Sequence, residues 1–196
     1  MTMIEAGRRL ALAAAVLVAL TGVLHAATYK LREPPLSGAD QAAFDAVARE
    51  NPEYLRSALR LGASPDARDD RQATLLMDAA WRGCASCAEV LLEAGAQADD
   101  IDPQGFTALM WAASNGRAEV VDLLLDAGAT VDLKNKRGLT ALMHAAWNGH
   151  ARTVLSLLEA GADPTLTDPH GRTPLELSYD SGDTETINLL IAVTMQ

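Results

Sequence analysis

The sequence has few aromatic side chains, few cysteines and few basic residues relative to acidic ones. Only 4% of the 196 residues are aromatic, whereas 37 are alanine, so the core must be built from small and aliphatic side chains in closely packed helices. Two cysteines exclude a dense disulfide framework. The 16 Lys and Arg residues against 26 Asp and Glu residues argue against a nucleic acid partner, which needs a basic surface. The hydrophobic fraction of 49% is too high for a disordered chain, and the length suits one domain or one extended array.

Residues 1–27 have the pattern of an export signal. Arg8 and Arg9 precede the uncharged stretch 10–27, which ends in small residues, as in a secretory signal peptide. The same stretch just reaches the length of about 18 residues at which a membrane-spanning helix becomes feasible. We therefore expect a cleaved signal and a periplasmic protein, with a retained inner-membrane anchor facing the periplasm as the alternative. Residues 28–37 are predicted to form a short, stiff linker.

Three short patterns recur with a spacing of 33 residues. They are a threonine, a glycine and a Gly-Ala pair, at Thr74, Thr107, Thr140 and Thr173, at Gly83, Gly116, Gly149 and Gly182, and at Gly62, Gly95, Gly128 and Gly161. Three registers with one period predict an array of equal structural units.

The unit that begins at Thr107 shows what each part of the repeat is expected to do. Thr107 is predicted to cap a first helix that ends at Gly116, because threonine accepts hydrogen bonds from free backbone N–H groups and glycine adopts the left-handed conformation. A second helix over 118–127 ends at Gly128 in the same way, and the polar segment 129–138 forms a turn-rich connection. One unit cannot bury its apolar face alone, so the units must stack.

These units resemble the ankyrin repeat family. The resemblance is carried by Thr107-Ala-Leu-Met-Trp-Ala-Ala and Thr140-Ala-Leu-Met-His-Ala-Ala, by residues 119–129, and by the final Thr173-Pro-Leu-Glu. It implies an all-α solenoid of stacked helix-turn-helix units with protruding hairpin loops. The array is predicted to comprise a divergent N-terminal capping unit at 38–67 and repeats at 68–101, 102–134, 135–167 and 168–196.

The sequence departs from the family pattern at two kinds of position. The histidine of the family's Thr-Pro-Leu-His opening is replaced by Met77, Met110, Met143 and Glu176. We therefore expect the usual threonine–histidine hydrogen bond to be missing. Gln72 takes the place of a glycine that the later repeats have before their threonine.

Cys84-Ala-Ser-Cys87 is the only motif in the sequence whose side chains could form a covalent bond, bind a metal or exchange electrons. A structural disulfide is the favoured interpretation, ahead of free thiols in the core and of redox or metal chemistry. Closing so short a loop would stabilise the fold only a little. No histidine cluster has the spacing of a metal site and no catalytic motif is present, so we expect neither an enzyme nor a cofactor.

The candidate binding residues are those that change between repeats while the frame stays constant. One such slot holds Asp78, Trp111, His144 and Leu177, and a slot that accepts these four side chains is not expected to be sealed core. By the resemblance, first-helix and hairpin positions line a concave face on which partners bind. The candidate partner-binding residues are Trp81, Arg82, Phe106, Trp111, Asn115, Arg137, Leu139, His144, Trp147 and Asn148. The three tryptophans are expected to form one aromatic strip.

We therefore predict a monomeric, non-catalytic module of the cell envelope that binds another protein. The alternative is an accessory protein that holds or protects an exported enzyme, for example in oxidative-stress defence, with Cys84 and Cys87 as a redox-active pair.

Overall fold

A computed structural model describes residues 37–195 of the chain, and within this range the backbone forms ten helices and no strand. The predicted signal or anchor at 1–27 and nearly all of the predicted linker lie outside the described residues. In chain order the helices are α2 (Gly38–Ala48), α3 (Pro52–Arg60), α4 (Leu75–Arg82), α5 (Ala85–Glu93), α6 (Ala108–Ser114), α7 (Ala118–Asp126), α8 (Ala141–Trp147), α9 (Ala151–Glu159), α10 (Pro174–Ser181) and α11 (Thr184–Thr194).

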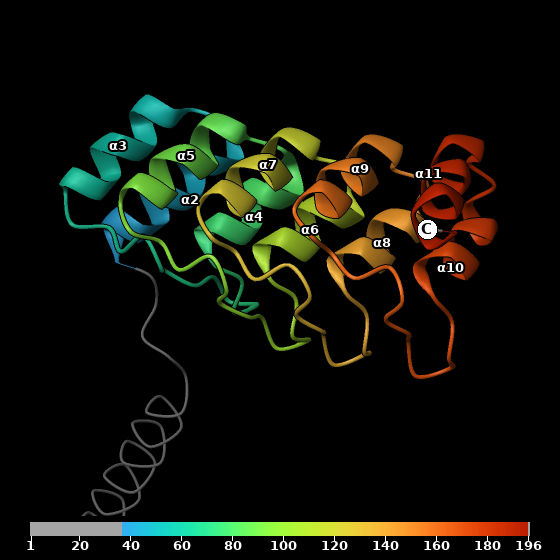
Figure 1. Cartoon of the computed structure of the whole chain (residues 1–196). Helices are drawn as coiled ribbons and strands as arrows, with labels where there is room; N and C mark the ends of the chain where they lie inside the picture. Colours follow the sequence, from blue (N-terminus) through green and yellow to red (C-terminus); the bar gives the residue numbers. More distant parts are fainter. Residues whose placement is uncertain (1–36, 196) are drawn as a thin grey trace, which may run out of the picture. The chain divides into compact units, whose positions relative to one another are not determined.

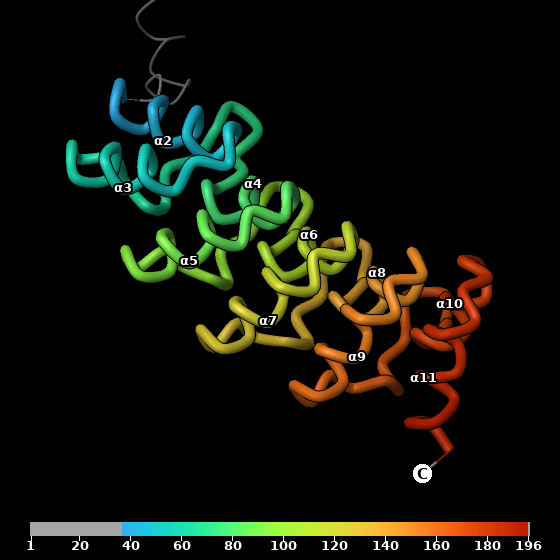
Figure 2. The backbone as a smooth tube through the Cα atoms, turned by 90° about the horizontal axis from the view of Figure 1, so that it is seen from above, coloured from blue at the N-terminus to red at the C-terminus, as the bar shows by residue number. Residues whose placement is uncertain are grey.

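The helices are arranged in two rows. The first helices of successive units, α2, α4, α6, α8 and α10, pack in chain order, and so do the second helices, α3, α5, α7, α9 and α11 (Figure 1). Seen from above, the two rows run side by side along the array (Figure 2). Fully buried alanines such as Ala112 and Ala145 allow this close approach of neighbouring helices. The prediction of an all-α solenoid is confirmed.

Each repeat begins its first helix with the predicted threonine cap. The Oγ1 atoms of the four threonines accept hydrogen bonds from the backbone N–H groups three residues later, which belong to Met77, Met110, Met143 and Glu176. In the last repeat the Glu176 carboxylate also accepts from the backbone N–H of Thr173 at 2.7 Å, which completes a capping box. The glutamate that replaces the family's histidine therefore restores a second bond to the cap.

The left-handed positions also follow the sequence pattern. Gly128 has a φ of 86° after α7, as predicted. Gln72 adopts a φ of 64° where the next repeat has Gly105 with a φ of 80°. A Cβ atom on Gly105 would lie only 3.0 Å from the backbone nitrogen of Lys136. Glycine is thus required there by the neighbouring hairpin as well as by its backbone conformation.

The N-terminal unit differs slightly from its predicted bounds. The sequence predicts helices over 40–49 and 53–61, and the structure has them at α2 and α3. Ser37 lies at the start of α2, where its hydroxyl oxygen accepts a hydrogen bond from the backbone N–H of Asp40, so it belongs to the helix cap and not to the linker. Among the helices of residues 37–195, none is long and apolar enough to span a membrane.

Aspartates at the ends of the hairpins connect consecutive repeats. Their carboxylates accept backbone N–H groups 31 residues further on, in the pairs Asp66–Gln97, Asp99–Thr130 and Asp132–Asp163. These three carboxylates hold the stacking register, because each one satisfies a backbone donor of the next unit.

Candidate functional site

The four hairpins share one internal geometry. Each starts with an aspartate or asparagine whose Oδ1 atom accepts hydrogen bonds from the backbone N–H groups two and four residues later. These residues are Asp69, Asp102, Asn135 and Asp168. Since Oδ1 is used in the same way each time, the repeats differ in what the second side-chain atom of this residue contacts.

In two hairpins the second atom is an oxygen paired with a cation. Asp69 Oδ2 lies 2.9 Å from Nε of Arg71, and Asp168 Oδ2 lies 3.0 Å from Nη2 of Arg172. Burial raises the pKa of Asp168, but hydrogen bonds from the backbone and guanidinium of Arg172 and from the backbone of His170 outweigh it and hold the pKa below its usual value. In these two hairpins an arginine therefore balances the charge of the first aspartate.

In the hairpin of the second repeat, the carboxylate has a neutral partner. Asp102 is only 6% exposed, and its Oδ2 accepts a hydrogen bond of 3.3 Å from the indole Nε1–H of Trp111. Within residues 37–195, no cationic side chain pairs with this carboxylate. Asp102 thus carries a charge that only neutral donors stabilise.

In the hairpin of the third repeat, an amide faces a buried imidazole. Asn135 uses its oxygen for the backbone, so its amide nitrogen donates to Nε2 of His144 at 3.0 Å, and that ring atom must be an acceptor. His144 is 4% exposed. Burial, with a smaller effect of the positive charge of Arg137, lowers the pKa of His144 from 6.5 to about 4. His144 is therefore a neutral interior group at physiological pH.

This arrangement corrects two predicted binding residues. His144 and Leu139 are 4% and 3% exposed, so neither can contact a partner. The expectation that the slot of Asp78, Trp111, His144 and Leu177 is not sealed core is wrong for His144 and also for Leu177, which is fully buried. A polar residue is tolerated inside this slot because the first residue of the hairpin supplies its hydrogen-bond partner, a contact between positions nine residues apart.

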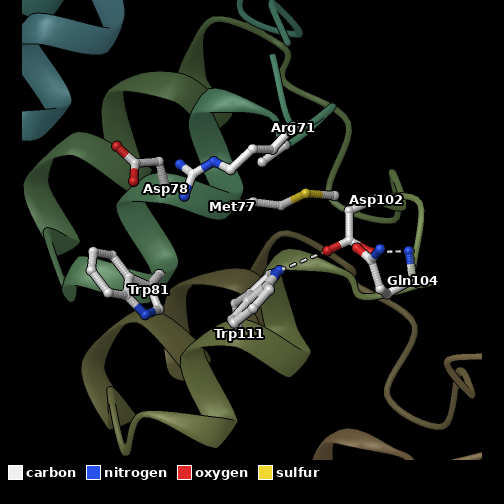
Figure 3. Close-up of a pocket in the computed structure, with 8 residues that line it drawn as sticks. Arg71, Met77, Asp78, Trp81, Asp102, Gln104 and Trp111 are labelled. Atoms are coloured by element: carbon white, nitrogen blue, oxygen red, sulfur yellow. Dashed lines mark hydrogen bonds between the residues drawn. The ribbon is translucent and has the colours of Figure 1, made fainter. Parts of the chain in front are cut away.

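Trp81 and Trp111 line one pocket between α4 and α6 (Figure 3). Its volume is about 270 Å³. The side chain of Met77 adds apolar surface above the ring of Trp111, and Asp78, Asp102 and Gln104 provide polar groups. Trp81 is 48% exposed, the largest exposed fraction of the three tryptophans.

Two arginines flank this pocket. The guanidinium of Arg82 lies 5.5 Å from the ring centroid of Trp81 and is paired with Asp78, with 3.0 Å between Nε and Oδ2. Arg71 lines the pocket from the hairpin, and 79% of its side chain is exposed. Arg82 thus supports one wall of the pocket, and Arg71 forms part of its rim.

Trp147 does not belong to this pocket. It is half-buried against Leu139, Met143 and Leu177, in a cluster separate from the main core, and the guanidinium of Arg137 lies 5.9 Å from its ring centroid. No ring contact links it to another tryptophan in the described part of the chain. The single aromatic strip expected from the spacing is therefore not formed.

Of the remaining candidates, Phe106 and Asn148 link α6 and α8, whereas Asn115 bonds within α6, the helix that it caps. Phe106 is half-buried between Trp111 and His144, with ring centroids 4.7 and 4.9 Å away. The amide of Asn115 donates to the carbonyl of Trp111, and that of Asn148 donates to the carbonyls of His144 and Ser114, one helix earlier. Of these residues, Asn148 remains exposed.

The two cysteines are joined in a disulfide at the start of α5. Cys84 is the helix cap, and its sulfur accepts a hydrogen bond from the backbone N–H of Cys87 at 3.2 Å. Cys84 is 5% exposed and Cys87 is fully buried. Among the described residues, no group of three or more potential ligands could hold a metal ion.

Two family models for ankyrin repeats match the chain. The model for three copies matches residues 43–135, and that for many copies matches residues 124–178, so the two together span most of the array. The chain belongs to the ankyrin repeat family. Ankyrin repeats generally mediate protein–protein interaction and are typically not catalytic. No curated protein matches this ankyrin chain at a significant level.

Proposed function

We propose that this ankyrin array is a module of the cell envelope that binds a partner protein. The binding site would be the hairpin face, formed by the first helices α4, α6, α8 and α10 and the hairpins that precede them. The observation that carries the proposal is the pocket between Trp81 and Trp111, which draws on two consecutive repeats. Tryptophan is enriched at the centres of interfaces because its large rigid ring buries much area and its N–H can still find a partner.

Export is the second part of the proposal. It is supported by Arg8 and Arg9 ahead of the apolar stretch, and by the pairing of Cys84 with Cys87, since disulfides persist in oxidising compartments. N-terminal sequencing of the mature protein should start at Ala27 or Thr28. A full-length product that sediments with membranes would establish an anchored protein instead.

An exported enzyme that the array holds or protects would be one form of partner. The geometry does not support the redox-active pair of this alternative. Thiol–disulfide exchange needs access to at least one sulfur, whereas Cys84 is 5% exposed and Cys87 is fully buried. We therefore propose partner binding without redox chemistry.

A photo-crosslinking experiment tests the hairpin face directly. A photoreactive phenylalanine analogue replaces Trp81 in one variant and Leu155 in the other, and both variants are produced in the native cell envelope. Leu155 is the matched control because it is 42% exposed but lies on α9, in the row of second helices. We expect a defined crosslinked partner from position 81 only. Equal crosslinking from position 155 would contradict the proposed face.

Affinity for the identified partner then measures the contribution of the pocket. Trp81→Ala should weaken binding by about 2 kcal/mol or more, whereas Leu155→Ala should leave it unchanged. Both side chains are substantially exposed, so both variants should unfold within about 1 kcal/mol of the original protein. Unchanged binding by the Trp81→Ala variant would remove the pocket from the interface.

A further inference from the structure

The pocket contains a buried carboxylate, that of Asp102, whose charge has no cationic partner within residues 37–195. The hairpin aspartates at the equivalent positions 69 and 168 pair with arginines of their own hairpins, and position 135 holds a neutral asparagine. Asp102 alone among these four combines a negative charge with neutral donors, and it lines the pocket of Trp81 and Trp111. A buried carboxylate gains stability from a nearby cation, because burial weakens its hydration.

A second carboxylate of the pocket keeps an acceptor atom available. Asp78 uses Oδ2 for Arg82, and a carboxylate has room for further hydrogen bonds at its other oxygen. In Figure 3, Asp78 and Asp102 lie on different sides of the pocket, with Arg71 and Met77 between them and the rings of Trp81 and Trp111 below. A cation placed among these groups would meet the faces of aromatic rings as well as two carboxylates.

The local charge balance favours a positively charged ligand. The charged side chains that line the pocket are Asp78, Asp102 and Arg71. Two negative charges against one positive charge leave one net negative charge among the lining residues. The chain as a whole has a formal charge of −10, which also favours a basic partner.

We propose that the pocket between Trp81 and Trp111 receives a basic side chain, an arginine guanidinium, from the partner protein. The guanidinium would stack on the indole rings and donate to Asp78 and Asp102. Arginine fits this role better than lysine, because its group is planar, weakly hydrated and presents several donors in fixed directions. The inference rests on the proposed function for the source of the side chain, but the chemistry of the pocket can be tested without the partner.

The test uses three small probes on the purified protein. Butylguanidinium imitates the arginine side chain, butylurea is its neutral counterpart of similar shape, and butylammonium imitates lysine. Binding is followed through the three indole N–H signals in NMR spectra. We expect butylguanidinium to shift the signals of Trp81 and Trp111 saturably and to leave that of Trp147 in place. It should bind about tenfold more tightly than butylurea, since the gain comes from charge.

Two variants test whether binding depends on the Asp102 carboxylate, each replacing an aspartate by an asparagine of similar size. Asp102→Asn should weaken butylguanidinium binding about tenfold, because it keeps Oδ1 for the hairpin but replaces the charged Oδ2, which accepts from Trp111, by an amide donor. Asn135 occupies the equivalent position in the next repeat, which shows that asparagine fits this turn. Asp168→Asn makes the same change in the last hairpin, away from the pocket, and should leave binding unchanged.

The Arg71→Ala variant tests whether the pocket prefers a cation or an anion. Arg71→Ala should tighten butylguanidinium binding, because it removes a positive charge from the rim. If the pocket instead recognises an anion through Arg71, this variant would weaken the binding of pentanoate, and the guanidinium probe would not bind. Four outcomes would each overturn the proposal. They are equal binding of butylurea, tighter binding of butylammonium, unchanged binding of butylguanidinium by the Asp102→Asn variant, and the absence of a saturable shift. Those outcomes would leave crosslinking from position 81 unaffected, so the failure of this inference is distinguishable from the failure of the proposed function.

Discussion

The second and third repeats share a backbone frame but use one slot in opposite ways. In the second repeat, Asp102 pairs with Trp111, and the pair borders an open pocket. In the third repeat, Asn135 pairs with His144, and the imidazole is sealed inside the array. The two hairpins hold their backbone through the same Oδ1 hydrogen bonds. The two slots thus differ in one pair of side chains, nine residues apart, and in whether they border an open pocket or lie in the core.

The largest expected effect tests whether the second and third repeats are packed equivalently. Leu124 and Leu157 occupy the same position on α7 and α9, and both are fully buried. Replacing either by alanine should lower the free energy of unfolding by about 2–5 kcal/mol, because the change removes apolar contacts and leaves a cavity. Chemical denaturation of both variants would give the two values. A small cost at one position and a large cost at the other would show that the frames differ.

The sealed slot should make stability depend on pH. The pKa of His144 is about 4 in the folded protein and about 6.5 unfolded, so the unfolded state binds more protons between these values. The contribution of neutral His144 to the free energy of unfolding should therefore be fully present above pH 6.5. It should be lost as the pH falls from 6.5 towards 4, by about 3 kcal/mol in total. Unfolding free energies measured across this range should show the decrease, whereas His144→Gln should show a flatter profile.

Changing the hairpin residue should alter the same profile. In Asn135→Asp, the new carboxylate would accept a hydrogen bond from a protonated His144, as a negative charge favours the charged imidazole. The pKa of His144 should rise and the loss of stability at low pH should become smaller. An NMR titration of the imidazole would measure the pKa directly. A pKa that stays near 4 would indicate that burial outweighs the partner.

The open slot should respond to loss of one hydrogen-bond donor. Trp111→Phe removes the N–H that contacts Asp102 and should cost about 1–3 kcal/mol, because a mostly buried carboxylate oxygen loses a donor. Trp147→Phe is the control, since its indole N–H makes no hydrogen bond within residues 37–195 and Phe retains much of its packing. Its cost should be smaller. Equal thermal and chemical stabilities of the two variants would argue against a stabilising role of the Asp102 contact.

The smallest expected effect again tests the common frame. Gly128 and Gly161 end the second helices of the two repeats with φ values of 86° and 87°, and a Cβ atom on either would meet no other atom within 4 Å. Replacing either by valine should cost about 1–2 kcal/mol, purely because a side chain disfavours the left-handed conformation. Thermal unfolding should give the same decrease for both. Different decreases would mean that the two helix ends are not equivalent.

Local sequence patterns were sufficient to predict the helices of the repeats. The spacing of 33 residues, the threonine caps and the terminal glycines predicted the order of the helices and their ends to within about two residues. These features depend on hydrogen bonds between residues close in the chain, such as that from Met110 to Thr107, so periodicity reveals them directly. The first-helix location of Trp81 and Trp111 was predictable for the same reason.

The chemistry of the variable slot was decided only by the tertiary structure. The sequence shows that Asp78, Trp111, His144 and Leu177 alternate in it, but whether each is buried depends on the partner that the hairpin presents across space. The separation of Trp147 from the other tryptophans has a similar origin, because its ring packs on Leu177 of the following repeat. A repeat pattern determines which helix or hairpin position carries a side chain. Its burial and hydrogen bonds depend on the atoms that neighbouring units place around it in the folded array.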